Sequence, residues 1–242
     1  MTMFLSGAAV GSNGEAEVAA RMPLIAVVGP WGSGTTVVMQ VLVRLGVLVP
    51  GPCFITNDPR TPNSLETLAF VKLLHSCVDE PTVTITRPEA IRPSLLAFRQ
   101  ILKTALGAQQ QPVALKHALM ATMFAELNAV FDIRYIFVSR PLKDIEATGH
   151  RRQWYAHLGA DGARRIYPLM EAYLKNPTQP VHGLSYPALL AEPEKTVKAL
   201  AGFLGLPYTP SALDILRRPT SSSVEKSLDV PAHPPRTSHP PQ

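Results

Sequence analysis

Long apolar segments, cysteines and aromatic residues are scarce in this chain of 242 residues. A membrane-spanning helix needs about 18 uninterrupted apolar residues, and no such stretch occurs. The segment from Met1 to Met22 has no basic start and so does not resemble a signal peptide. Two cysteines, Cys53 and Cys77, are too few for a disulfide framework or a cysteine-based zinc motif. These absences predict a soluble, cytoplasmic protein without a membrane partner.

Nucleic acid is not an expected partner either. Aromatic residues make up 7% of the chain, and no run of Lys and Arg is interleaved with them. The formal net charge of +5 is spread along the chain and fits a small anionic ligand better. The apolar fraction of 46% is sufficient for one buried core. No pattern in the sequence indicates an oligomeric state.

The two ends of the chain differ in composition from its middle. Residues 219–242 are rich in Pro and Ser and have few large apolar side chains, so burial cannot offset the entropy cost of ordering them. We therefore expect a flexible leader over residues 1–21, one domain over residues 22–218 and a disordered tail over residues 219–242.

Short apolar runs alternate with helical patterns inside the domain. Strands are predicted at residues 24–28, 112–116, 134–139 and 181–186, and helices at 35–45, 63–77, 89–106, 141–155, 162–174 and 194–204. The second helix is predicted to open with a capping box, Asn63-Ser64-Leu65-Glu66. This alternation favours an α/β fold, a three-layer αβα architecture with a central parallel sheet. Ligands of such sheets bind at the carboxyl ends of the strands.

A glycine-rich loop follows the first predicted strand and leads directly into a helix: Gly29-Pro30-Trp31-Gly32-Ser33-Gly34-Thr35-Thr36. Glycines allow the backbone to curl so that successive N–H groups point inward, and the helix N-terminus adds its dipole. The hydroxyls of Ser33, Thr35 and Thr36 are further donors. The pattern predicts binding of a multiply charged anion. A tight strand–helix turn with Thr35 as the N-cap is the alternative without a ligand.

The anion is not expected to be ATP. A Walker P-loop has Lys where this loop has Thr35. The later strand ends in Ser139, whereas NTPases hold Mg²⁺ with an Asp after such a strand. The dinucleotide-binding pattern G-x-G-x-x-G is absent as well. Ordinary NTPases, kinases and dinucleotide-binding enzymes are thus disfavoured.

Two further motifs accompany the loop. The strand at 134–139 is followed by Arg140-Pro141, and Thr148 lies eight positions after Arg140. A Tyr-x-x-Leu-Leu-x-x-Pro stretch spans residues 186–193 and precedes a helix that ends in Phe203-Leu204-Gly205. In this order after Ser-Gly-Thr-Thr, the motifs resemble those of the PAPS-dependent sulfotransferases, particularly the bacterial small-molecule group. The resemblance covers about residues 23–208.

The resemblance implies a P-loop-type sulfotransferase fold, the nucleotide PAPS as sulfate donor and 3′,5′-ADP as product. It also implies a hydroxyl of a small molecule or sugar as acceptor. In the family the loop binds the 5′-phosphosulfate of the donor; the corresponding residues here are Gly32, Ser33, Gly34, Thr35 and Thr36. The strand-end Arg and the later hydroxyl hold the 3′-phosphate, and here these are Arg140 and Thr148.

The residues themselves agree with that assignment. An Arg at a strand end with a hydroxyl two turns into the next helix is suited to a phosphate. A surface ion pair of Arg140 with Asp144 or Glu146 is the alternative. Arg152, one turn beyond Thr148, is predicted as a further anion contact.

Two departures from the family pattern concern positive charges. The family usually has Lys or Arg just before Ser-Gly-Thr, where this chain has Gly32. The C-terminal Gly-x-x-Gly-x-x-Lys element of many members is missing as well. Arg60 is a candidate to replace the first charge, and Arg217 with Arg218 the second.

Sulfuryl transfer needs charge neutralisation at the leaving phosphate and deprotonation of the acceptor hydroxyl, but no metal. The seven histidines show no metal-ligand spacing, so no metal site is expected. Lys116, at a strand end where the family places a Lys, is the candidate cation. A surface Lys that extends into solvent is the alternative.

Two residues are candidates for the catalytic base. His117 titrates near neutral pH, but it can share a pocket with Lys116 only if the strand ends there. Asp58 lies in a polar loop where some carbohydrate sulfotransferases have an acidic base, and an Asx turn before Pro59 is its alternative role.

Two other functions stay open at this point, an atypical P-loop kinase and a nucleotide-binding module without activity. The absent Lys and Mg²⁺-binding Asp argue against the kinase. Gly32 in place of a basic residue favours the silent module.

Overall fold

The computed structural model describes residues 21–56, 58, 61–107 and 111–217. The predicted tail lies outside this range, as does the predicted leader apart from its last residue. Arg60 and Arg218, two of the candidate replacement charges, lie outside it too. Within the described residues no helix is both long and apolar enough to cross a membrane.

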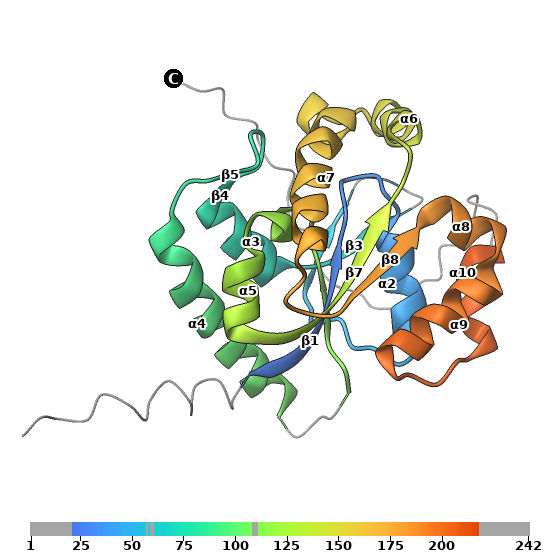
Figure 1. Ribbon diagram of the computed structural model, residues 1–242, viewed down its shortest axis with the longest axis horizontal. Helices are drawn as coiled ribbons and strands as arrows, with labels where there is room; N and C mark the ends of the chain where they lie inside the picture. Colours follow the sequence, from blue (N-terminus) through green and yellow to red (C-terminus); the bar gives the residue numbers. More distant parts are fainter. Residues whose placement is uncertain (1–20, 57, 59–60, 108–110, 218–242) are drawn as a thin grey trace, which may run out of the picture.

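A four-stranded parallel sheet forms the centre of the molecule (Figure 1). Its strands, in spatial order, are β6 (Ala114–Lys116), β1 (Met22–Val28), β7 (Phe131–Ser139) and β8 (Val181–Ser185). Each neighbouring pair is parallel, and each parallel connection passes through helices. The predicted α/β fold with a central parallel sheet is therefore confirmed.

The alternation of side chains along the strands divides the core into two layers. In β1, Leu24, Ala26 and Val28 belong to one buried cluster, whereas Ile25 and Val27 belong to the other. Four helices cover the first face: α3 (Leu68–Cys77), α4 (Pro88–Leu106), α5 (Phe124–Val130) and α7 (Ala160–Lys175). Three helices cover the second face: α2 (Thr35–Arg44), α8 (Tyr186–Ala191) and α9 (Pro193–Leu204).

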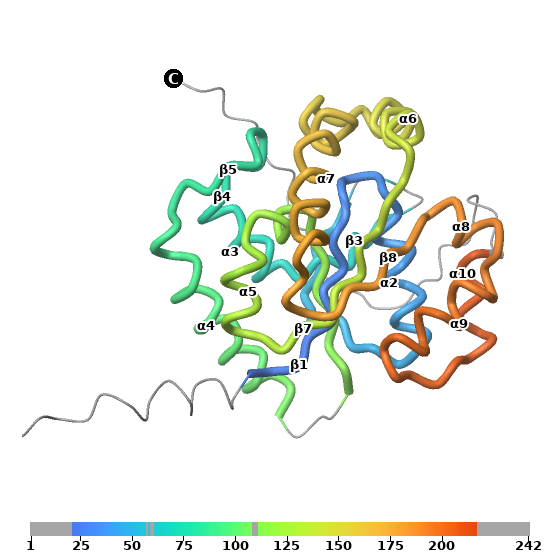
Figure 2. Tube along the Cα trace, viewed as in Figure 1, coloured from blue at the N-terminus to red at the C-terminus, as the bar shows by residue number. Residues whose placement is uncertain are grey.

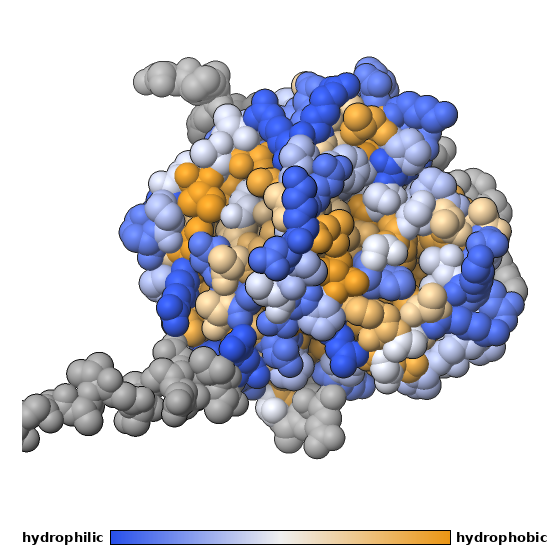
Figure 3. Space-filling model, viewed as in Figure 1, coloured by the Kyte–Doolittle hydropathy of each residue, from blue (hydrophilic) through white to orange (hydrophobic). Residues whose placement is uncertain are grey.

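Helix α7 illustrates how the amphipathic pattern places a helix on the sheet. Ile166 and Met170, four positions apart, are buried against the first face of the sheet. Polar residues of the same helix are exposed, among them Arg164 and Glu171. Figure 3 shows this hydrophilic stripe along the outside of α7.

The glycine loop and the end of β7 lie at the same end of the sheet. The chain leaves β1 and β7 side by side at this end, and α6 (Leu142–Arg152) lies next to it (Figure 2). Parallel pairing requires this arrangement, because all four strands point their carboxyl ends the same way. The predicted rim for ligand binding is therefore present.

Most of the predicted helices and strands are present, with ends shifted by a few residues. The short elements were not predicted: helices α5 and α8, the small hairpins β2 (Cys53–Ile55) with β3 (Asn63–Thr67) and β4 (Val78–Asp79) with β5 (Thr84–Ile85), the 3₁₀ helices η1 (Ala118–Thr122), η2 (Ala156–Leu158) and η3 (Pro210–Leu213), and the final turn α10 (Asp214–Arg217). Such short segments show too few periods of an apolar pattern to be recognised.

The predicted capping box at residues 63–66 is wrong. These residues form strand β3, and helix α3 begins only at Leu68. The Ser64 hydroxyl donates to the backbone oxygen of Phe54 on β2 (2.8 Å), which ties it to the hairpin. It also accepts from the Glu66 N–H (3.1 Å). The Glu66 side chain therefore does not cap a helix, and its carboxylate pairs with Lys116 at the end of β6.

Replacement of Gly34 tests the packing of the loop. Gly34 has φ +99°, and a Cβ there would lie 2.1 Å from Cδ2 of Tyr186. Gly34→Ala is expected to lower the free energy of unfolding by at least about 1–2 kcal/mol from the backbone conformation alone. Urea denaturation measures this.

Gly202→Ala is the matched control, because no atom lies within 4 Å of a Cβ at this position in α9. It is expected to raise the free energy of unfolding by about 0.5–1 kcal/mol through helix propensity. Equal stability of the two variants would contradict both the left-handed conformation of Gly34 and its close packing against Tyr186.

Candidate functional site

The glycine loop presents unpaired backbone donors at the N-terminus of α2. Gly32 and Gly34 both have positive φ, +82° and +99°, which bends the backbone around the loop. The first N–H groups of a helix have no partner within the helix, and in α2 these belong to Thr35 and Thr36. An anion is the natural partner for such groups. Gly34 is the N-cap, so the alternative of a turn capped by Thr35 does not apply.

Ser33 provides the clearest sign that this loop binds a ligand. Its side chain is fully buried, yet its hydroxyl has no hydrogen-bond partner among the described residues. A buried hydroxyl without a partner is costly and uncommon in folded proteins. A phosphate oxygen in the loop would satisfy it. The residues of the loop therefore fit a phosphorylated ligand.

Arg140 and Thr148 come together as predicted. The guanidinium of Arg140 donates from Nη1 to the Gly32 backbone oxygen (2.9 Å) and to the Thr148 hydroxyl (3.1 Å). Thr148 in turn donates to the backbone oxygen of Asp144 (2.9 Å). Within the part of the chain that the structure describes, the Arg140 guanidinium donates to neutral oxygens and not to the carboxylates of Asp144 or Glu146. Its positive charge is thus available to an anion.

Two tyrosines support Arg140. The Tyr186 ring lies under the guanidinium, with Cζ of Arg140 5.0 Å from the ring centroid. The Tyr167 hydroxyl accepts from the Arg140 backbone N–H (2.8 Å) and donates to the Arg140 backbone oxygen (2.7 Å). Burial raises the pKa of Tyr167, so the phenol stays protonated and able to donate. A cavity of about 380 Å³ opens beside Arg140, at the ends of β7 and β8.

Lys116 is buried at the end of β6, and its ammonium group contacts two side chains. Its ammonium group donates to the Thr36 hydroxyl (3.0 Å) and pairs with the Glu66 carboxylate (3.0 Å). The side chains of Lys116 and Glu66 are only 5% and 17% exposed, so this ion pair has little contact with water. Burial alone would raise the pKa of Glu66, but the Lys116 ammonium group outweighs it and lowers the pKa. The alternative of a solvent-exposed Lys116 is therefore ruled out.

His117 follows the end of β6 and is buried. Its Nδ1 accepts from the Leu119 N–H (3.1 Å), which caps η1. The neutral imidazole consequently carries its hydrogen on Nε2 and acts as a donor there. Trp31 and His75 pack edge-on against the ring, with centroids 6.3 Å and 5.6 Å away. Burial lowers the pKa of His117, so the ring is neutral at pH 7.

The fold also assembles a cluster that the sequence spacing did not predict. Ligand atoms of His75, Glu80 and His117 lie within 4.8 Å of one another, and His157 approaches Glu80 to 3.8 Å. A metal-bound histidine normally donates its second nitrogen to an acceptor. His117 does the reverse, because its Nδ1 accepts from Leu119. This geometry favours a hydrogen-bonded cluster over a metal site.

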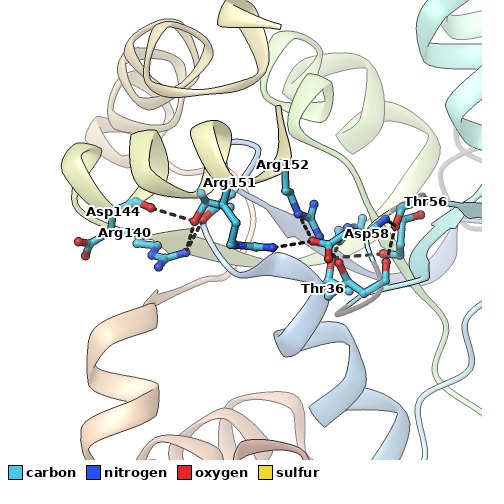
Figure 4. Close-up of polar contacts among 12 residues, drawn as sticks. Thr36, Thr56, Asp58, Arg140, Asp144, Arg151 and Arg152 are labelled. Atoms are coloured by element: carbon cyan, nitrogen blue, oxygen red, sulfur yellow. Dashed lines mark hydrogen bonds and ion pairs between the residues drawn. The ribbon is translucent and has the colours of Figure 1, made fainter. Parts of the chain in front are cut away.

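Asp58 lies between two arginines of α6. Nη1 of Arg151 lies 3.2 Å from Oδ2 of Asp58, and Nε of Arg152 donates to the same oxygen. Arg152 also donates to the Thr61 hydroxyl. Figure 4 shows both arginines reaching from α6 toward Asp58, on the side of the site where Thr36 lies. The carboxylate thus serves as a counter-ion in the described structure.

Sequence reasoning missed Glu66, Trp154 and Tyr167 as parts of this site. Glu66 was interpreted as a capping residue, and only its pairing with Lys116 shows where the side chain points. The contacts of Trp154 and Tyr167 join segments far apart in the sequence. No local motif could have indicated them. Tyr186 belongs to the Tyr-x-x-Leu-Leu-x-x-Pro stretch at residues 186–193, but the sequence did not indicate its contact with the loop.

Fold and site together define an α/β protein whose glycine loop, at the rim of a parallel sheet, fits a phosphorylated ligand. A profile of the sulfotransferase family matches residues 23–210, which is most of the chain. The chain belongs to the sulfotransferase family. The predicted family and enzyme class, a PAPS-dependent sulfotransferase, are thereby confirmed.

Solved structures of bacterial sulfotransferases have a similar fold. The sulfotransferase domain of the olefin synthase from Synechococcus PCC 7002 is 15% identical, with a TM-score of 0.54 over 83% of this chain and 79% of that one. Sulfotransferase STF1 from Mycobacterium tuberculosis H37Rv is 17% identical, with a TM-score of 0.56 over 83% and 72%. STF9 from Mycobacterium avium is 15% identical, with a TM-score of 0.52 over 84% and 69%. Identities this low indicate a common fold. No curated protein matches the chain in sequence.

The buried His117 predicts how stability depends on pH. Burial holds the folded pKa below the usual 6.5, so below about pH 6.5 the unfolded chain binds a proton that the folded chain does not. The free energy of unfolding should therefore fall as the pH drops, by up to about 1.4 kcal/mol per pH unit for one proton.

His117→Asn should reduce this slope, because the amide oxygen can still accept from Leu119 but does not titrate. Urea denaturation at pH 7.5, 6.5 and 5.5 measures the slope. His182→Asn is the comparison variant. Burial lowers the pKa of this half-buried histidine as well, so His182→Asn shows how much of the slope comes from a histidine outside the site. An unchanged slope in His117→Asn would show that the ring is not held neutral by the fold.

Proposed function

We propose that this chain transfers the sulfuryl group of PAPS to a hydroxyl of a small-molecule or sugar acceptor and releases 3′,5′-ADP. The observation that supports this most is the buried Ser33 hydroxyl without a partner, in a loop whose Gly32 oxygen is held by Arg140. The glycine loop and Arg140, which can each bind an anion, thus lie next to each other. This arrangement suits a nucleotide with phosphates at both the 5′ and 3′ positions.

The donor-binding residues are those of the loop and of the end of β7. In the proposal Gly32, Ser33, Gly34, Thr35 and Thr36 bind the 5′-phosphosulfate through backbone N–H groups and hydroxyls. Arg140 and Thr148 bind the 3′-phosphate. Arg152 is a further anion contact. PAPS itself supplies the sulfuryl group, and the protein contributes position and charge.

Lys116 is proposed to neutralise the charge that develops on the leaving phosphate. Its bond to the Thr36 hydroxyl places the ammonium group at the N-terminus of α2, where the helix dipole also favours negative charge. Preorganised donors in a buried site act more strongly than in water, because they need no reorientation during the reaction. Lys116 is already fixed by two bonds in this structure.

Glu66 is proposed as the base that takes the proton of the acceptor hydroxyl. Asp58 is already paired with two arginines. The neutral His117 has its hydrogen on Nε2, so this nitrogen donates and does not accept. Glu66 is ionised and lies at Lys116, where the reaction is proposed to occur.

A catalytically silent nucleotide-binding module is the second candidate. The observation that favours it is Gly32, since the loop itself contains no positively charged side chain. Both candidates predict nucleotide binding, so turnover must be measured separately.

Arg140 should determine nucleotide recognition. Saturating 3′,5′-ADP is expected to raise the melting temperature of the protein, whereas ATP with Mg²⁺ is not. Arg140→Ala should lose most of this response, because a charge-assisted contact to the 3′-phosphate contributes about 1.5–3 kcal/mol. Differential scanning fluorimetry measures the shift, with the exposed Arg164→Ala on α7 as control. No shift with 3′,5′-ADP in the wild type would rule out the sulfotransferase proposal.

Glu66→Gln should separate enzyme from silent module. Loss of a general base lowers kcat about 10²–10⁴-fold, while 3′,5′-ADP should still raise the melting temperature of the variant. The assay follows release of 3′,5′-ADP from PAPS with a panel of phenols, alcohols and sugars. His117→Asn should reduce kcat less. Equal turnover by Glu66→Gln and wild type would exclude Glu66 as the base, and no turnover by the wild type with any acceptor would favour the silent module.

A further inference from the structure

The glycine loop has no positive side chain of its own, and the space beside Gly32 is already filled. A Cβ at Gly32 would lie 3.3 Å from Cζ3 of Trp154, with Ile145 and Thr148 only slightly farther away. The positive φ of Gly32 would strain any other residue there. A long cationic side chain therefore cannot replace Gly32 without moving Trp154.

The end of α6 brings Trp154 back onto the loop. Gln153 has φ +52°, a left-handed conformation that non-glycine residues seldom adopt. The Trp154 N–H donates to the Gly149 backbone oxygen (3.0 Å), which reverses the chain direction at the helix end. Local backbone strain of this kind is often retained where it positions a functional group.

Arg152 lies on the Trp154 ring. Its Cζ is 4.8 Å from the ring centroid, a distance typical of a cation–π contact. Its Nε and Nη2 donate to Asp58 and to Thr61, so the guanidinium is held from several sides. The side chain is only 17% exposed. Holding a long arginine side chain in one conformation costs side-chain entropy, which these contacts must offset.

The charges around Arg152 do not balance. Two guanidinium groups, those of Arg151 and Arg152, share the single carboxylate of Asp58 (Figure 4). This group of three side chains carries a net charge of one positive unit. An excess positive charge next to an anion-binding loop attracts the anion and strengthens its binding.

We propose that Arg152, positioned by Trp154, supplies the positive charge for the 5′-phosphate group of the bound nucleotide, which the loop itself does not carry. Arg152 is then a ligand-binding residue and Trp154 a positioning residue that acts through it. The inference rests on the proposed function, because it assumes that the loop binds the 5′ end of PAPS.

The test compares two nucleotides by isothermal titration calorimetry. One is 3′,5′-ADP; the other is adenosine 3′-phosphate, which lacks the 5′-phosphate. Arg152→Gln should weaken 3′,5′-ADP about tenfold or more, the effect expected of one charge-assisted hydrogen bond. It should leave the affinity for adenosine 3′-phosphate unchanged. Arg152→Lys, which keeps the charge, should retain more affinity for 3′,5′-ADP than Arg152→Gln, and Arg164→Gln on α7 should change neither affinity.

Trp154→Ala tests the positioning role. It should weaken 3′,5′-ADP selectively, as Arg152→Gln does, and the double variant should bind little worse than either single one, because both changes remove the same interaction. Gly32→Lys should restore affinity for 3′,5′-ADP only when Trp154→Ala has opened the space beside the loop. Urea denaturation of each variant checks that the fold is retained.

The outcomes separate this inference from the proposed function. If the wild type does not bind 3′,5′-ADP, the proposed function fails. If the wild type binds it and Arg152→Gln binds equally well, only the inference is overturned. An equal loss of affinity for both nucleotides would also overturn it, because that result indicates a structural role. Additive effects of the Arg152 and Trp154 changes would exclude the positioning role of Trp154.

Discussion

Strand β1 is hydrogen-bonded along both edges, to β6 and to β7, and this double pairing determines where the charged groups of the site lie. The register sets Val27 beside Lys116 and Val28 beside Phe137, so the three strands end at nearly the same level. A shift of one residue would exchange the side chains that β1 packs against its two helix layers, and is strongly disfavoured. The glycine loop, Lys116 and Arg140 therefore emerge together at one rim.

Charge at this rim is distributed in two ways. The buried Lys116 has a carboxylate partner in Glu66, which offsets the desolvation of both groups and connects the β2–β3 hairpin to the sheet. Arg140 instead donates to neutral oxygens, and Arg151 and Arg152 share one carboxylate. The first arrangement stabilises the fold and holds Lys116 at the loop, whereas the second leaves an excess of positive charge for a ligand. Functional sites commonly retain such unbalanced groups at some expense of stability.

Several parts of the site could be predicted because their geometry is local. The turn from β1 into α2 follows from glycines at positions that require positive φ, and the pairing of Arg140 with Thr148 follows from two helical turns between them. Glu66 could not be placed, since its neighbours also fit a capping box and only the Ser64 bond across the hairpin excludes that. The tautomer of His117 likewise depends on the Leu119 N–H, which turns toward the ring only because η1 begins there.

The sequence by itself determined the strand–loop–helix unit, the α/β alternation and the family, because these depend on side-chain periodicity and on residues close together in the chain. Only the tertiary structure decided which partner each charged group has. Arg152 and Asp58 are 94 positions apart, and Lys116 and Thr36 are 80 apart. Contacts over such separations arise from packing of whole helices on the sheet, and no short motif records them. The position of Trp154 against Gly32 is of this kind, and it decides where the positive charge beside the loop comes from.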